Sequence, residues 1–164
     1  MKLENEFLCV EIKEVGAEVT RIYDKRNNTE ILWNGDAKFW KRHSPILFPN
    51  VGKAWKNTIL IDGVQYPASQ HGFARDTRFE CAEVSEDFAV FRMESTKETK
   101  KRYPYEFELS VSYCLNGREL EVGWQVKNCT DGNMYFTIGA HPAFAFAEEG
   151  EVKADYCLKF PGKE

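Results

Sequence analysis

The sequence has no long uninterrupted run of apolar residues. Residues 1–16, MKLENEFLCVEIKEVG, alternate charged with apolar side chains, whereas a signal peptide or a membrane-spanning helix needs a continuous apolar stretch. The pattern therefore argues against a secretory leader and against a membrane partner. We expect a cytoplasmic location.

An excess of charge of one sign is also lacking. The 22 basic residues stand against 26 acidic ones, which gives a formal net charge of −4. The one short basic stretch runs from Lys97 to Arg102. Proteins that bind nucleic acid usually carry a strongly basic surface, so the composition argues against a nucleic-acid partner.

Several motifs that mark known chemistry are missing. The five cysteines form no C-x-x-C pair, and no G-x-S-x-G or phosphate-binding glycine loop occurs. An odd number of scattered cysteines in a reducing compartment predicts buried thiols rather than disulfides or a zinc site. The other absences argue against a serine hydrolase and against nucleotide chemistry. We therefore expect no bound metal.

Aromatic residues and period-two alternation are what the sequence has in abundance. Aromatics make up 14% of the chain. From Phe107 to Leu115 every second residue is apolar, which is typical of a strand with one solvent-facing side. Comparable segments predict strands at about 4–13, 17–24, 77–85, 87–95 and 151–160. Turn dipeptides predict tight hairpins at Asp62-Gly63, Asn116-Gly117 and Asp131-Gly132.

No segment carries a sustained helical repeat, although Ser95–Lys101 fits a single helical turn. The prediction is an all-β fold, an antiparallel β-sandwich or barrel. The length of 164 residues fits one domain spanning residues 1–164.

Three segments break the alternation and are candidates for function. The first begins at Phe39 and contains Pro45 and Pro49, which favour an extended, irregular backbone. The others are residues 70–76 and 139–144. Irregular segments on rigid sheets often carry binding and catalytic residues.

Two of the three histidines, His71 and His141, stand in the latter two segments. Histidine can give or take a proton near neutral pH. A structural interpretation stays open for each: His71 as a loop histidine held by Asp76, and His141, which precedes Pro142, as a capped core histidine.

Three motifs together resemble the aldose 1-epimerase family, most closely a bacterial uncharacterised branch of it. They are SPILFPNVG at residues 44–52, QHGFAR at residues 70–75 and GAHPAF at residues 139–144. The resemblance implies a galactose mutarotase-like β-supersandwich with a sugar cleft across one sheet. It implies interconversion of the α and β anomers of aldoses, without metal or cofactor, and some relatives act on hexose 6-phosphates.

The resemblance also implies roles for individual residues. His141 matches the general acid that protonates the ring oxygen, and His71 matches the histidine that binds the sugar and assists. Arg75 is a candidate donor to a sugar hydroxyl or a phosphate, with an ion pair to Asp76 as the alternative. Asn50 and Lys53 are further candidates for sugar binding, and Lys53 stands where many members have arginine.

Aromatic side chains near these motifs are candidates for a sugar-stacking platform, although each also suits the core. They are Trp40, Phe48, Trp55, Phe73 and Phe144.

Family members continue well beyond a length of 164 residues. The resemblance therefore implies a sandwich truncated after about its first half, incomplete at its C-terminal end and without the catalytic glutamate. Glu148 and Glu149 are substitutes for that base in principle, but beside Gly150 they suit a solvated turn. Unpaired sheet edges predict a homo-oligomer. The alternative function is a non-catalytic carbohydrate-binding or interaction module with the same fold.

Overall fold

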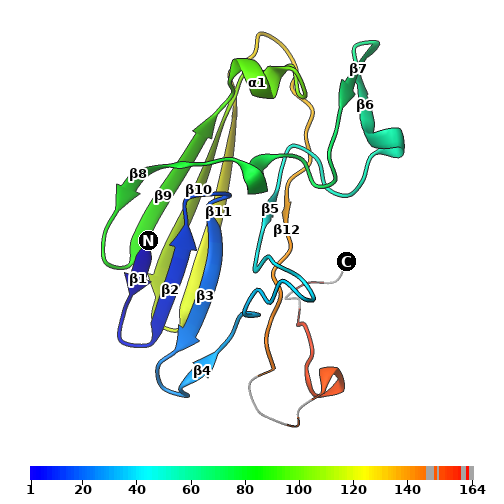
Figure 1. Ribbon diagram of the computed structural model, residues 1–164. Coiled ribbons are helices and arrows are strands. Elements are labelled where there is room, and N and C mark those ends of the chain that lie inside the picture. The colour runs from blue at the N-terminus through cyan, green and yellow to red at the C-terminus, as the bar shows by residue number, and fades with distance from the viewer. Residues whose placement is uncertain (147–149, 151, 160–161, 163–164) are drawn as a thin grey trace.

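The computed structural model describes residues 1–146, 150, 152–159 and 162. Figure 1 shows two antiparallel four-stranded sheets, with two short strand pairs beside them. The first sheet has the order β1 (Lys2–Glu4), β2 (Leu8–Lys13), β3 (Glu18–Asp24) and β4 (Thr29–Glu30). The second has the order β11 (Glu119–Asn128), β10 (Phe107–Asn116), β9 (Phe88–Glu94) and β8 (Glu80–Val84).

The short pairs lie to one side of the two sheets (Figure 1). Strand β5 (Ile46–Leu47) pairs with β12 (Gly139–Ala140), and β6 (Thr58–Ile61) pairs with β7 (Val64–Pro67). The described helices are single turns: η1 (Trp55–Asn57), η2 (Ala74–Asp76), α1 (Lys97–Lys100) and η3 (Lys153–Asp155). No helix among the described residues is long and apolar enough to span a membrane.

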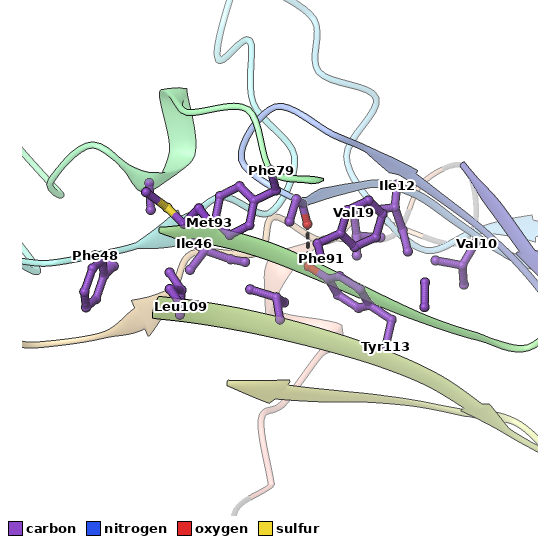
Figure 2. Packing of buried hydrophobic residues seen from close by; sticks show 14 of the residues in the cluster. Val10, Ile12, Val19, Ile46, Phe48, Phe79, Phe91, Met93, Leu109 and Tyr113 are labelled. Atoms are coloured by element: carbon purple, nitrogen blue, oxygen red, sulfur yellow. Dashed lines mark hydrogen bonds between the residues drawn. The ribbon is translucent and has the colours of Figure 1, made fainter. Parts of the chain in front are cut away.

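The hydrophobic core lies between the two sheets. Residues of β2 and β3 pack against residues of β9 and β10, as Figure 2 shows, and the Tyr113 hydroxyl donates to the Ala17 carbonyl across the gap. The alternation in residues 107–115 is confirmed, because all five odd-numbered residues are buried. Burial of such a side chain stabilises the fold by about 1.5–3 kcal/mol.

Two of the three predicted hairpins are confirmed. Asp62 (φ 48°) and Gly63 (φ 81°) form the two-residue turn between β6 and β7, and both adopt the positive φ of a type I′ turn. Gly117 (φ 57°) begins the two-residue turn between β10 and β11. The helical turn at Ser95–Lys101 is confirmed as α1, whose N-cap Thr96 accepts from the Thr99 amide.

The Asp131-Gly132 hairpin was a wrong prediction, because residues 133–138 form no strand. This segment instead runs beside the irregular residues around Pro49 and donates from the Thr137 amide to the Pro49 carbonyl. The strand at 151–160 is also wrong for its described residues, which contain η3. The strand at 4–13 is interrupted after β1, because the Asn5 side chain accepts from the amides of Phe7 and Leu8.

The prediction of buried thiols holds for one cysteine only. Cys9 is buried and Cys114 is partly buried, whereas Cys81, Cys129 and Cys157 are exposed. Cys81 and Cys129 lie on β8 and just after β11, the two outer strands of their sheet. Strands at a sheet edge have fewer neighbours to cover their side chains, which explains the difference.

Candidate active site

The irregular segment before β5 is fixed by a buried carboxylate. Glu18, at the start of β3, is fully buried, and its Oε1 accepts from the amides of His43 (2.7 Å) and Ser44 (3.0 Å). Lys13 pairs with its other oxygen. A buried charge that satisfies two backbone donors in this way holds the segment firmly in one place.

The residues after His71 pack directly on the carbonyl of Phe48. The amides of Phe73 and Ala74 both donate to the Phe48 carbonyl, at 2.9 and 3.1 Å. Gly72 lies so close that a Cβ built on it would be 2.1 Å from the same oxygen, and its φ is +70°. Only glycine fits this position, and the close approach brings residues 70–75 beside residues 44–52.

His71 is held by two hydrogen bonds to Gly52. The His71 amide donates to the Gly52 carbonyl (2.8 Å), and the Gly52 amide donates to Nδ1 of the His71 ring (3.0 Å). Because an amide N–H can only donate, Nδ1 is an acceptor and the neutral ring carries its proton on Nε2. His71 has φ +65°, a strained conformation for a residue with a side chain.

The electrostatic surroundings favour the neutral form of this ring. Desolvation lowers the pKa of His71 below its ordinary value, and proximity to Arg75 and His141 lowers it further. Protonation would place a hydrogen on Nδ1, opposite the Gly52 amide, so the hydrogen bond opposes it as well. His71 is therefore suited to donate a hydrogen bond from Nε2.

His141 reaches the same place from the end of β12. Its amide donates to the Pro45 carbonyl (3.1 Å), which extends the β5–β12 pairing by one residue. The ring centroids of His71 and His141 are 6.1 Å apart, and Trp40 packs on His141 at 5.1 Å. His141 is exposed. The structure thus brings together two histidines that are distant in the sequence, with one face open to solvent.

The three predicted binding residues have different surroundings. Arg75 donates from Nη2 to the Gln70 carbonyl (2.7 Å), and its Nε lies 3.7 Å from Asp76, so the ion pair with Asp76 is present. Asn50 spans the loop by donating to the carbonyls of Gly52 (3.3 Å) and Ser69 (3.2 Å). Lys53 is exposed and makes no hydrogen bond or ion pair with the described residues.

Of the aromatic residues expected to form a sugar-stacking platform, some are buried in the core and others lie on the surface. Phe48 and Phe73 are core residues with 0% and 5% exposure, so neither can stack on a ligand. Trp55 and Phe144 are exposed, and Trp40 is the one that contacts a site histidine.

Sequence reasoning missed Glu18 and Ser69. The Ser69 hydroxyl donates to the Gly72 carbonyl (2.6 Å) and accepts from Arg102 (2.6 Å), which closes the loop around His71. No sequence pattern marks either residue, because their roles depend on partners that are distant in the sequence.

Neither a carboxylate nor a metal-binding cluster accompanies the histidines in the described part of the chain. No described Asp or Glu bonds to the ring of His71 or His141, and residues 1–146, 150, 152–159 and 162 contain no group of three potential metal ligands. Glu148 and Glu149, the candidates for a substitute base, lie outside the described residues.

Comparison with known proteins agrees with this arrangement. A family model described as aldose 1-epimerase matches residues 1–161. The chain belongs to the aldose 1-epimerase family. This membership, together with the two packed sheets, confirms the expected galactose mutarotase-like sandwich.

The relatives of this chain in the aldose 1-epimerase family include protein LacX and proteins with solved structures. Protein LacX, encoded on a plasmid of Lactococcus lactis subsp. lactis, is 37% identical over 98% of the chain and 56% of its own length. A galactose mutarotase-like protein from Lactobacillus casei is 38% identical with a TM-score of 0.88, over 92% of this chain and 51% of its own.

A galactose mutarotase related enzyme from Lactobacillus acidophilus is 35% identical with a TM-score of 0.91. That match covers 94% of this chain and 52% of the other. The chain therefore spans about half the length of the relatives it matches.

Proposed function

We propose that this chain provides the histidine side of a sugar site that interconverts the α and β anomers of aldoses. The main support for the proposal is that the rings of His71 and His141 lie close together, with their centroids 6.1 Å apart. Family membership supports an epimerase-like activity, and the similarity to galactose mutarotase-like structures supports a sugar as substrate.

Anomer exchange needs two proton transfers on one small ring. A base removes the proton of the C1 hydroxyl, and an acid protonates the ring oxygen as the bond between C1 and that oxygen breaks. Rotation about C1–C2 and reclosure with the opposite proton transfers gives the other anomer. No electron transfer is involved.

We assign the acid to His141 and the supporting hydrogen bond to His71. His141 is exposed at the end of β12, so a ligand can reach its ring. The hydrogen bond from Gly52 to Nδ1 places the proton of the neutral His71 ring on Nε2. Nε2 lies 3.2 Å from the Gln70 side-chain amide, and in the proposal an oxygen of the sugar replaces that neighbour and accepts from Nε2–H. Arg75 and Asn50 are positioning residues in this proposal, since their donors already hold the loop that carries His71.

The described residues place no carboxylate beside the histidine rings. In this proposal, the catalytic base is therefore supplied by a residue outside the described ones. The same observation favours the second candidate function, a carbohydrate-binding module without catalysis, which keeps the two histidines as ligand contacts only.

Chemical rescue distinguishes the two functions. Exchange NMR on the anomeric protons of glucose, galactose and a hexose 6-phosphate measures interconversion with and without added acetate, after subtraction of the protein-free rate. If His141 is the acid and a carboxylate is missing, acetate should raise the rate at least about tenfold, and His141→Ala should abolish that increase. His43→Gln is the control, because it changes a histidine outside the pair.

An acetate effect that is equal in the wild type and His141→Ala would overturn the acid assignment. If sugar shifts the signals of both imidazoles but acetate has no effect, the binding module is the correct function. If no sugar shifts either signal, both are wrong.

Three expectations remain predictions. They are the cytoplasmic location, a single domain over residues 1–164, and a homo-oligomer formed through unpaired sheet edges. Strand β11 lies at the edge of its sheet, and sedimentation velocity over a range of concentrations tests the oligomer.

A further inference from the structure

Arg102 stands apart from the other arginines of this acidic protein. Each of the seven others lies within 4.0 Å of a carboxylate: Arg21, Arg26, Arg42, Arg75, Arg78, Arg92 and Arg118. Arg102 has no carboxylate partner among the described residues. In a chain with a net charge of −4, this leaves a cation available to an external anion.

Two acidic residues that line a hollow with Arg102 are paired with other cations. Glu98 pairs with Lys101 (2.6 Å), and Asp76 pairs with Arg42 (2.8 Å). Arg102 and these two carboxylates line one shallow hollow, yet no ion pair forms there. Their charge is already neutralised in part by the neighbouring cations.

The guanidinium of Arg102 is held in place by neutral groups. Its Nη2 donates to the Ser69 hydroxyl (2.6 Å), and its central carbon lies 5.3 Å from the centroid of the Phe73 ring. One of its five N–H groups is thus used and one face is covered. The remaining donors are oriented in advance, which lowers the entropic cost of binding a ligand.

A second unpaired cation, Lys53, lines a different hollow together with Arg102. The hollow has a volume of about 500 Å³, and its lining includes Lys53, Ser69, Gln70 and Arg102. The Gln70 side-chain amide lies 3.2 Å from Nε2 of His71, so the hollow adjoins the histidine pair.

We propose that this hollow is an anion subsite, in which Arg102 and Lys53 bind an anionic substituent of the sugar held at His71 and His141. The inference rests on the proposed sugar site and narrows its substrate class to aldoses that carry a phosphate or a carboxylate. A planar guanidinium forms paired hydrogen bonds with either group, and an ammonium adds charge.

Binding measured by NMR shift titration at low salt tests the subsite. The ligands are glucose, glucose 6-phosphate, glucuronate and inorganic phosphate. At least one of the two anionic sugars should bind about tenfold more tightly than glucose and more tightly than inorganic phosphate. Which of the two binds more tightly identifies the substituent.

Three variants separate anion binding from loop positioning. Arg102→Gln and Lys53→Gln should each weaken binding of the anionic sugar more than binding of glucose, and so remove most of the preference for the anionic sugar. Ser69→Ala removes the hydrogen bond but keeps the charge, and should retain the preference. Arg92→Gln loses the same charge on β9, where Arg92 pairs with Glu108, and controls for net charge. Lys53 is exposed and makes no hydrogen bond or ion pair with the described residues, so Lys53→Gln tests the subsite should Arg102→Gln misfold.

Equal affinities for glucose and both anionic sugars would overturn the subsite and leave the sugar site intact. A preference for the anionic sugar over glucose that persists in both Arg102→Gln and Lys53→Gln would also contradict the anion subsite. Inorganic phosphate binding as tightly as the sugars would show an anion site unrelated to the substrate. No binding of any sugar would instead contradict the proposed function itself.

Discussion

At the scale of single residues, the site depends on two adjacent positions with positive φ. His71 (φ 65°) and Gly72 (φ 70°) turn the chain so that the imidazole faces the histidine partner while the next two amides bind the Phe48 carbonyl. A side chain is strained in this conformation, and it persists here because the loop is fixed by Gly52, Ser69 and Arg75.

Gly72→Ala should destabilise the fold by about 2–5 kcal/mol, because the methyl group adds a clash with Phe48 to the backbone strain. Gly63→Ala is the matched control. Its φ is also positive (+81°), but nothing lies within 4 Å of the added carbon, so it should cost about 1–2 kcal/mol. Urea denaturation measures both, and equal losses would contradict the importance of the close approach.

The pKa of His71 should lie below that of an ordinary histidine, about 6.5. Desolvation and the nearby Arg75 and His141 lower it, so the fold favours the neutral ring. The resulting stability is present above pH 6.5 and is lost as the pH falls toward the pKa of the folded state.

An NMR titration tests this expectation. The Gly52 amide signal should shift with the same midpoint as the His71 ring, because its hydrogen bond to Nδ1 breaks on protonation. Arg75→Gln should raise the midpoint, and Arg92→Gln should leave it unchanged. A wild-type midpoint at or above 6.5 would show that the surroundings do not favour the neutral ring.

At the scale of elements, the short β5–β12 pair joins the two histidine segments. It contains only two residues from each strand, too few to be stable in isolation. Its position depends on Glu18 of β3, which holds the backbone of His43 and Ser44 just before β5. A carboxylate in the first sheet thus helps to position the segments that carry the two histidines.

Glu18→Ala should cost about 2–4 kcal/mol of stability, because it leaves two backbone donors without partners in a buried environment. Glu18→Gln keeps an oxygen acceptor and should cost less. Glu11→Ala, on the exposed side of β2, where Glu11 pairs with Arg21, should stay within about 0.5 kcal/mol. Thermal unfolding measures the three variants, and similar losses for Glu18→Ala and Glu11→Ala would refute the anchoring role.

At the scale of the whole molecule, the core covers only part of the second sheet. Tyr113 and Val122 are opposite each other on β10 and β11 and therefore share one face. Tyr113 is 2% exposed, whereas Val122 is 46% exposed. Leu120 and Val126, on the same face of β11, pack partly against the core, so this face is only partly covered at β11.

This difference predicts unequal responses to truncation of the same residue type. Val111→Ala should destabilise the fold by about 2–3 kcal/mol, because Val111 is fully buried and its removal leaves a cavity. Val122→Ala should stay within about 0.5 kcal/mol. Chemical denaturation at low protein concentration compares the two, and a large loss for Val122→Ala would show that its face is covered in solution.

The sequence by itself determined the class of fold and most of the second sheet. Local signals are sufficient there: alternation places Leu109 and Val111 in the core, and the dipeptides at 62–63 and 116–117 turn the chain regardless of distant contacts. The same local signals failed for residues 131–138, where the Thr137 amide bonds to the distant Pro49 carbonyl, and for the described part of 151–160, where local hydrogen bonds form the turn η3.

The motifs in the sequence identified the two histidines, but only the tertiary structure decided how they are arranged. The 6.1 Å separation of the rings, the tautomer of His71 and the role of Glu18 all depend on groups far apart along the chain. Composition and spacing carry no information about such pairings. Burial likewise decided that Phe48 and Phe73 belong to the core and that Arg102 lacks a carboxylate partner among the described residues.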